Sequence, residues 1–154
     1  TQEYAGDPMS AIVTSIQGRL YAINQTITGV NAVRVFHGQP DSAMLPLIFS
    51  VPGRSSRNTS QIGAQRDEQT RIFRLILVVE AWMAGFPTET AQLSAETLID
   101  TIQEAYLTRP RLELNDEPLD AVSRVLLPDD TGVVPFGPYA AVEYPLAITY
   151  HKRL

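Results

Sequence analysis

The sequence predicts an α+β fold: a single antiparallel or mixed sheet of about four or five strands with two helices packed on one face. Two segments carry apolar residues at the three- and four-residue spacing of a helical face, and several others alternate apolar and polar residues as strands do. The segments follow one another as helix, two strands, long polar loop, long strand, helix and two strands. Two helices are too few for a doubly wound parallel sheet, so hairpin connections are expected.

The composition agrees with one domain over residues 1–154. Of the 154 residues, 44% are hydrophobic and 19% are charged, which is typical of a soluble globular protein. No apolar run approaches the length of a membrane span, and the N-terminus lacks a basic segment followed by an apolar one. Neither membrane insertion nor Sec export is therefore expected.

The first helix is predicted over residues 8–28. Asp7 supplies an N-cap acceptor, and Pro8 suits the first helical position. Gly29 fits a left-handed cap at the far end. The polar face of this helix is almost uncharged, because Arg19 is its one charged residue, so it is expected to face either solvent or a neighbouring subunit. The apolar face consists of Met9, Ile12, Val13, Ile16, Leu20, Ile23 and Ile27.

Two short strands, 33–36 and 45–51, are predicted next. Pro46 cannot donate a ladder hydrogen bond, so it belongs at a strand start or a sheet edge. Residues 53–69 carry almost no apolar side chains and are predicted to form a long polar loop. Loops of this length are usually functional or disordered. We expect this loop to be flexible in the monomer and to become ordered against another subunit.

The long strand 71–82 follows directly. Its alternation places five apolar residues on one face, which we expect under the helices: Phe73, Leu75, Leu77, Val79 and Ala81. The other face mixes apolar residues with two opposite charges and a tryptophan: Arg74, Ile76, Val78, Glu80 and Trp82. This mixture favours contact with a partner over contact with bulk water.

The second helix is predicted over residues 91–107, because apolar residues recur there at helical spacing and Arg109-Pro110 ends the pattern. Strands are predicted at 121–127 and 139–150, separated by a turn at 128–132 and a loop at 133–138. Pro145 interrupts the hydrogen bonding of the last strand and indicates an edge strand or a bulge.

Sequence motifs give little support to catalysis or to cofactor binding. The chain has no cysteine, its two histidines lack metal-ligand spacing, and the glycine patterns of phosphate-binding loops are absent. No cofactor or metal is therefore expected. Asp129 and Asp130 lie in a turn sequence, where aspartate caps its own backbone. A small hydrolase using His37 with Asp41, or the pair Asp129–Asp130, remains an alternative.

Five arginines crowd into the polar loop and the strand after it: Arg54, Arg57, Arg66, Arg71 and Arg74. They could contact phosphates, but no aromatic residue interleaves with the loop arginines and the net charge is −5, so a nucleic-acid module is disfavoured. A solvated loop and contact with carboxylates of another subunit both fit. With Glu80 and Trp82, these arginines form the predicted interface to another protein subunit.

The chain resembles the tail terminator (tail completion) proteins of long-tailed bacteriophages. The resemblance rests on the order of five pieces: the helix from Pro8, the strand 47–51, the loop feeding 71–80, the helix 95–106 and the closing segment 140–150. It implies a structural virion protein rather than an enzyme. Such a protein assembles in the host cytoplasm and sits at the tail–neck junction.

The resemblance also implies partners, and the polar loop and the predicted interface would then meet a ring neighbour or the tail tube. It implies a ring, expected to be hexameric, that caps the tail tube protein, ends tube polymerisation and offers a docking surface to the head connector or stopper protein. DNA would pass through the channel without specific binding. Related head–tail joining proteins of the neck look similar at this level, so a head-side adaptor is the alternative.

Overall fold

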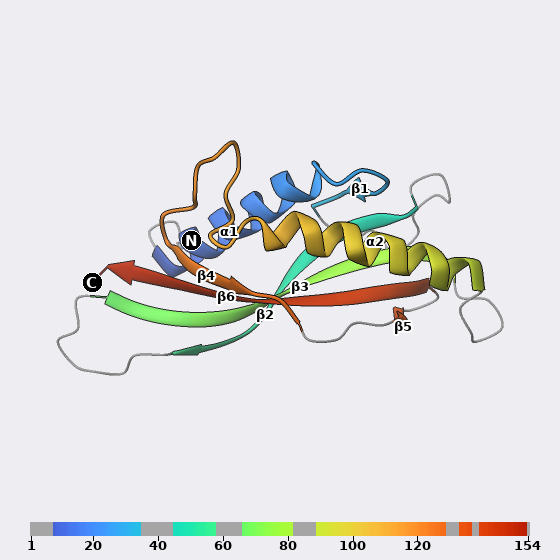
Figure 1. Cartoon of the computed structure of the whole chain (residues 1–154). Helices are drawn as coiled ribbons and strands as arrows, with labels where there is room; N and C mark the ends of the chain where they lie inside the picture. The colour runs from blue at the N-terminus through green and yellow to red at the C-terminus, as the bar shows by residue number, and fades with distance from the viewer. Residues whose placement is uncertain are drawn as a thin grey trace.

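The computed structural model describes residues 8–34, 45–57, 66–81, 89–128, 133–136 and 139–153. The elements are α1 (Pro8–Asn24), β1 (Asn31–Ala32), β2 (Leu47–Arg57), β3 (Arg66–Ala81), α2 (Glu89–Leu107), β4 (Val122–Leu126), β5 (Val133–Phe136) and β6 (Tyr139–Arg153). One strongly twisted sheet carries both helices on the same face (Figure 1). The predicted α+β class is confirmed.

The sheet is mixed, with the strand order β1-β2-β3-β6-β4 and with β5 paired to β6 beside this path. β1 pairs parallel to β2, in the register Asn31↔Leu47, and every other pairing is antiparallel. The strand predicted at 33–36 is therefore misplaced. Residues 33 and 34 follow β1 rather than forming a strand, and residues 35 and 36 lie outside the described residues.

The prediction of a loop over residues 53–69 is wrong at both ends. β2 continues to Arg57 and β3 begins at Arg66, and the pairing Arg57↔Gln69 makes these ends one antiparallel ladder. Residues 58–65 lie outside the described residues. Backbone hydrogen bonds hold this ladder, so it needs no alternation of apolar side chains. The predicted loop 133–138 is wrong over Val133–Phe136, which forms β5 against β6, and residues 137 and 138 lie outside the described residues.

α1 ends at Asn24, four residues before the predicted end. The backbone N–H groups of Thr26 and Ile27 bond to carbonyls three residues back, at 2.9 and 3.1 Å, and the Thr26 hydroxyl also donates to the Ile23 carbonyl at 2.6 Å. These bonds replace the i→i−4 ladder by tight turns. Gly29 has the predicted positive φ, 93°, but it lies in these turns rather than directly after the helix.

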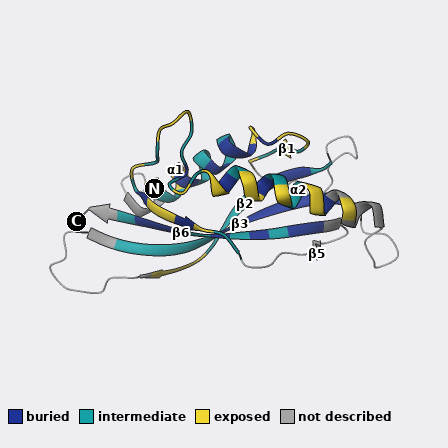
Figure 2. Ribbon diagram, viewed as in Figure 1, coloured by how far each residue is buried: buried dark blue, intermediate teal, exposed yellow. Residues whose placement is uncertain are grey.

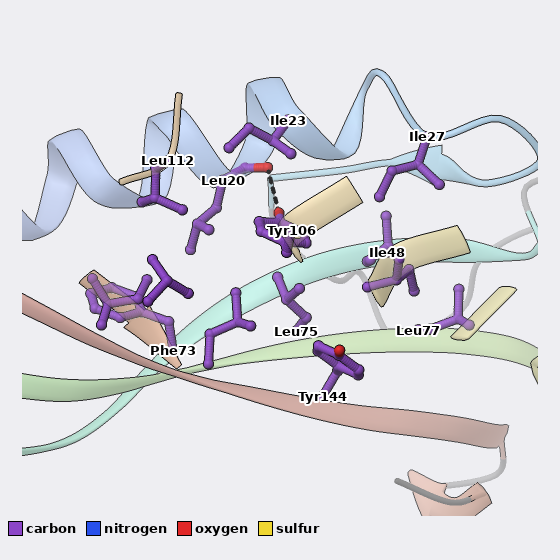
Figure 3. Close-up of a cluster of buried hydrophobic side chains, with 14 of the residues drawn as sticks. Leu20, Ile23, Ile27, Ile48, Phe73, Leu75, Leu77, Tyr106, Leu112 and Tyr144 are labelled. Atoms are coloured by element: carbon purple, nitrogen blue, oxygen red, sulfur yellow. Dashed lines mark hydrogen bonds between the residues drawn. The ribbon is translucent and has the colours of Figure 1, made fainter. Parts of the chain in front are cut away.

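The main core lies between the two helices and the helix-side face of the sheet (Figure 3). As predicted, the β3 residues on this face are buried: Phe73, Leu75, Leu77 and Val79. The helices contribute buried side chains that include Ile16, Leu20 and Ile23 from α1 and Ile102 and Tyr106 from α2. Figure 2 shows exposed residues along the side of α2 that faces away from the sheet.

A second buried cluster lies on the opposite face, called the far face below. It consists of Leu47, Phe49, Ile76, Val78 and Ala141, each at most 4% exposed. Ile76 and Val78 belong to the β3 face that was predicted to meet a partner. They are buried within the chain itself, so that prediction does not apply to them.

Pro145 lies in an interior strand, because β6 has β3 on one side and β4 and β5 on the other. β5 pairs with residues 139–142 and β4 with residues 147–150, so Pro145 falls in the gap between these two partners. The predicted edge strand is wrong for β6 as a whole, and the alternative, a bulge, is wrong at Pro145, because the register with β3 runs there without a shift. The physical reason for the prediction still holds, because the missing N–H lies where β6 locally has one described neighbouring strand.

Candidate subunit interface

The structure divides the predicted interface residues into separate groups along β3. Arg54, Arg57, Arg66 and Arg71 gather at the end of the sheet where β2 and β3 pair through residues 55–57 and 69–71. Glu80 lies near the other end of β3, fourteen residues beyond Arg66, or roughly 45 Å along an extended strand. Trp82 lies outside the described residues. The described positions of this set therefore lie at separate places along β2 and β3.

At the arginine end of the sheet, the beginning of β3 pairs with the end of β2 on one side and with the end of β6 on the other. In Figure 1 this end, where β3 begins and β6 finishes, extends past both helices. Arg66 pairs in register with Arg153, and Asp67 pairs with Lys152. The exposed side chain of Arg54 lies on β2 at a register shift between Pro52 and Ser55. At this end, the exposed Arg54 is a candidate for contact with a partner.

Arg71 has a local role. Its Nε donates to the carbonyl of Gly53 at 3.0 Å, across the register shift in β2. A Cβ on Gly53 would stand 3.0 Å from the carbonyl oxygen of Ile72, so the close approach of β3 favours glycine there. Arg71 and Gly53 together hold the irregular part of the hairpin. Arg71 therefore stabilises the β2–β3 ladder, which makes it a weaker candidate for contact with a partner.

Arg74 has a partner inside the chain. Its Nε forms an ion pair with Glu143 of β6, and the two side chains are 39% and 38% exposed. In the β3–β6 register, Glu143 lies opposite Ile76, one step along the far face from the position opposite Arg74. Sequence reasoning missed Glu143, although a search for opposite charges on the two long predicted strands could have found it. The ion pair makes Arg74 a weaker candidate for a partner carboxylate.

Three further arginines are used to hold the segment between α2 and β4. Arg19 of α1 donates from Nη1 to the carbonyls of Leu112 and Glu117, both at 2.8 Å. Arg109 donates to the carbonyls of Ala105 and Glu113, and Arg111 to those of Val122 and Asp120. The acidic residues Asp116, Glu117 and Asp120 of this segment are exposed, whereas Glu113 is half-buried and accepts a hydrogen bond from the backbone N–H of Arg111 at 2.7 Å. Arg19 therefore contacts its own chain, and the choice between solvent and a neighbouring subunit for the rest of the polar face of α1 stays a prediction.

The residues of the alternative hydrolase sites, His37, Asp41, Asp129 and Asp130, lie outside the described residues. Within the described ranges, no group of three His, Cys, Asp or Glu residues is arranged to hold a metal ion. His151 pairs in register with Glu68, and its Nδ1 lies 3.4 Å from the Ser123 hydroxyl. Neither α1 nor α2, the helices of the described part, is long and apolar enough to cross a membrane.

Two tyrosines have perturbed pKa values, and both lie in the core. Burial raises the pKa of Tyr106 far above its ordinary value, and nearby Arg109 offsets a part of this effect. Burial also raises the pKa of Tyr144. Both pKa shifts follow from packing and do not mark a reactive site.

Compared with known proteins, the chain matches no family model, and no curated protein matches its sequence.

Proposed function

We propose that this chain is a structural subunit of the virion of a long-tailed bacteriophage, and that it forms a ring, expected to be hexameric, on the end of the tail tube. The ring would stop tube polymerisation and present a docking surface to the head connector. Its role is architectural rather than enzymatic, and DNA would pass through its channel.

The observation that carries this proposal is the arrangement of the pieces on which the family resemblance rests. The long strand and the closing strand belong to one sheet. The opening helix and the second helix both lie on one face of this sheet. This arrangement supports the proposal because it agrees with the small α/β protein that the resemblance implies. At the arginine end, Arg54, Ser55 and Ser56 of β2 are exposed, and β3 is the one described strand that pairs with β2 there. Such a sheet edge is of the kind that a neighbouring subunit can extend or contact.

Charge is also consistent with the proposed channel. The net charge of −5 disfavours tight, nonspecific binding of DNA, which a channel protein must avoid if the genome is to slide through it. The three arginines that hold the segment after α2 donate to backbone carbonyls of the chain. These hydrogen bonds do not neutralise the exposed carboxylates of that segment.

The direct test is native mass measurement and negative-stain imaging of the purified protein, alone and mixed with uncapped tail tubes. The proposal predicts a closed ring on tube ends and tubes that no longer lengthen. Binding to heads rather than to tails would reassign the protein to the head side of the neck. Binding to neither assembly would refute the proposal.

A variant can test the arginine end without disturbing the fold. The triple substitution Arg54→Ser, Arg57→Ser and Arg66→Ser removes three charges but keeps every backbone pairing of β2 and β3. We expect an unchanged melting temperature and a loss of tube capping. The matched control is Arg34→Ser, an exposed arginine that stacks over Tyr21 at 4.3 Å on the helix side of the molecule. This control should leave capping intact.

A further inference from the structure

The outward side of α2 carries an unusual row of side chains, called the α2 outer stripe. It consists of Leu93, Glu96, Asp100, Glu104 and Leu107, all exposed and spaced by three or four residues. The two leucines at its ends are 60% and 59% exposed. The opposite side of the helix, with Ile102 and Tyr106, packs into the core.

The α2 outer stripe is costly for a free helix. Glu96, Asp100 and Glu104 follow one another at i, i+4 and i+8, a spacing at which like charges repel. The two exposed leucines add apolar surface that contacts water. A partner with an arginine and an apolar side chain would relieve both costs.

The edge strand β4 presents such a pair, called the β4 edge. Arg124 and Leu126 are both exposed and lie opposite Thr149 and Ala147 of β6, so their side chains lie on the far face of the sheet along its β4 edge, while Val125 points into the core. Leu126 is 50% exposed. β4 ends the strand order of the sheet, so its outer side has no neighbouring strand among the described elements.

The two surfaces are complementary in chemistry and in spacing. Leu93, Leu107 and Leu126 are the large apolar side chains that the described residues leave exposed, and all three belong to these two surfaces. Arg124 and Leu126 are about 7 Å apart along a strand, and Glu104 and Leu107 are about 5 Å apart along a helix. An arginine side chain is long enough to span this difference.

We propose that the β4 edge of one copy of this chain docks on the α2 outer stripe of a second copy, with Leu126 against Leu107 and Arg124 beside Glu104. The two surfaces differ, so the contact is heterologous and leads head to tail from copy to copy. Closure of such contacts into a ring rests on the proposed function. The contact itself can be tested separately.

Cysteine cross-linking tests the contact directly, because the chain has no cysteine of its own. The full-length variants Leu107→Cys and Leu126→Cys are mixed and treated with a short bismaleimide, in solution and on tail tubes. The mixture should give a cross-linked dimer, and each variant alone should give none. The control pair is Leu126→Cys with Ser15→Cys, which places the thiol on an exposed position of α1 and should not react.

Charge reversal gives a second readout. Arg124→Glu and Glu104→Arg should each weaken self-association about tenfold or more, because each places like charges together, and the double variant should recover most of the loss. All three variants should keep the melting temperature of the parent protein, since both side chains are exposed.

The outcomes separate this inference from the proposed function. Rings that cap tubes but give no cross-link between positions 107 and 126 would overturn the contact and leave the proposed function standing. Cross-linking within either single-variant sample would overturn the head-to-tail arrangement. Head-to-tail cross-linking without any capping would support the contact and refute the proposed function. A chain that stays monomeric in solution and on tubes would overturn both.

Discussion

The phenol oxygen of Tyr106 donates a hydrogen bond of 2.7 Å to Oδ1 of Asn24, and both side chains are at least 99% buried. Tyr106 lies in the last turn of α2, and Asn24 is the last residue of α1. The bond therefore joins the C-terminal ends of the two helices over the sheet. It is a polar contact among the apolar side chains of the main core.

Tyr106→Phe should lower the free energy of unfolding by about 1–3 kcal/mol, because it leaves the buried Asn24 oxygen without this donor. Urea denaturation monitored by circular dichroism would measure the change. The control is Tyr21→Phe, which removes a hydroxyl from an exposed hydrogen bond with Gln25 and should change stability little. Equal effects of the two substitutions would contradict the structural role of the Tyr106–Asn24 bond.

Stability should fall in alkaline solution. Burial raises the pKa of Tyr106 in the folded state above the value of 10.0 that the unfolded chain retains. The folded state therefore prefers the neutral phenol. The associated stability is fully present below pH 10.0 and is lost as the pH rises from there towards the folded-state pKa.

The measurement is the free energy of unfolding of the parent chain and of Tyr106→Phe at about pH 8 and about pH 11. The parent should lose more stability than the variant between these two conditions. Tyr144, whose pKa burial also raises, contributes in the same direction. The two chains would lose the same stability if Tyr106 ionised freely in the folded state.

The Arg74–Glu143 ion pair should contribute little to stability, about 0–1 kcal/mol, because both side chains are more than one third exposed. Arg74→Glu should lower the melting temperature by placing two carboxylates together, and the swap with Glu143→Arg should restore it. Ring formation by the same variants is the second measurement. If Arg74→Glu leaves assembly intact, the middle of β3 lies outside the subunit interface.

Gly53→Ala should destabilise the protein by about 1 kcal/mol or more, because the added Cβ would press against the Ile72 carbonyl in a place that holds the β2–β3 ladder. Thermal unfolding would measure this loss. Gly18 in α1 is the matched control, since a Cβ there meets nothing within 4 Å. Gly18→Ala should stabilise the helix by about 0.5–1 kcal/mol. A loss at position 18 as large as at position 53 would contradict this account.

Much of the fold was predictable because its core elements repeat apolar residues at a regular period. The face of α1 that includes Ile16, Leu20 and Ile23, and the face of β3 from Phe73 to Val79, bury the residues that the spacing selects. Burial of these faces outweighs local preferences, so periodicity alone predicts them. The candidate site was less predictable. Arg71 and Arg74 could be named from the sequence, but Gly53 and Glu143 become their partners through the pairing of distant strands.

The sequence by itself therefore determined the two helices, the long central strand and the side of the sheet that the helices cover. Tertiary structure alone decided the polar strand ends around Arg57 and Arg66, the parallel pairing of β1 and the Arg74–Glu143 pair. The physical reason is that a helix or strand with one buried face needs apolar residues at a regular spacing, which can be seen within that segment of the sequence. Backbone ladders and cross-strand charges instead depend on which segment comes to lie beside it.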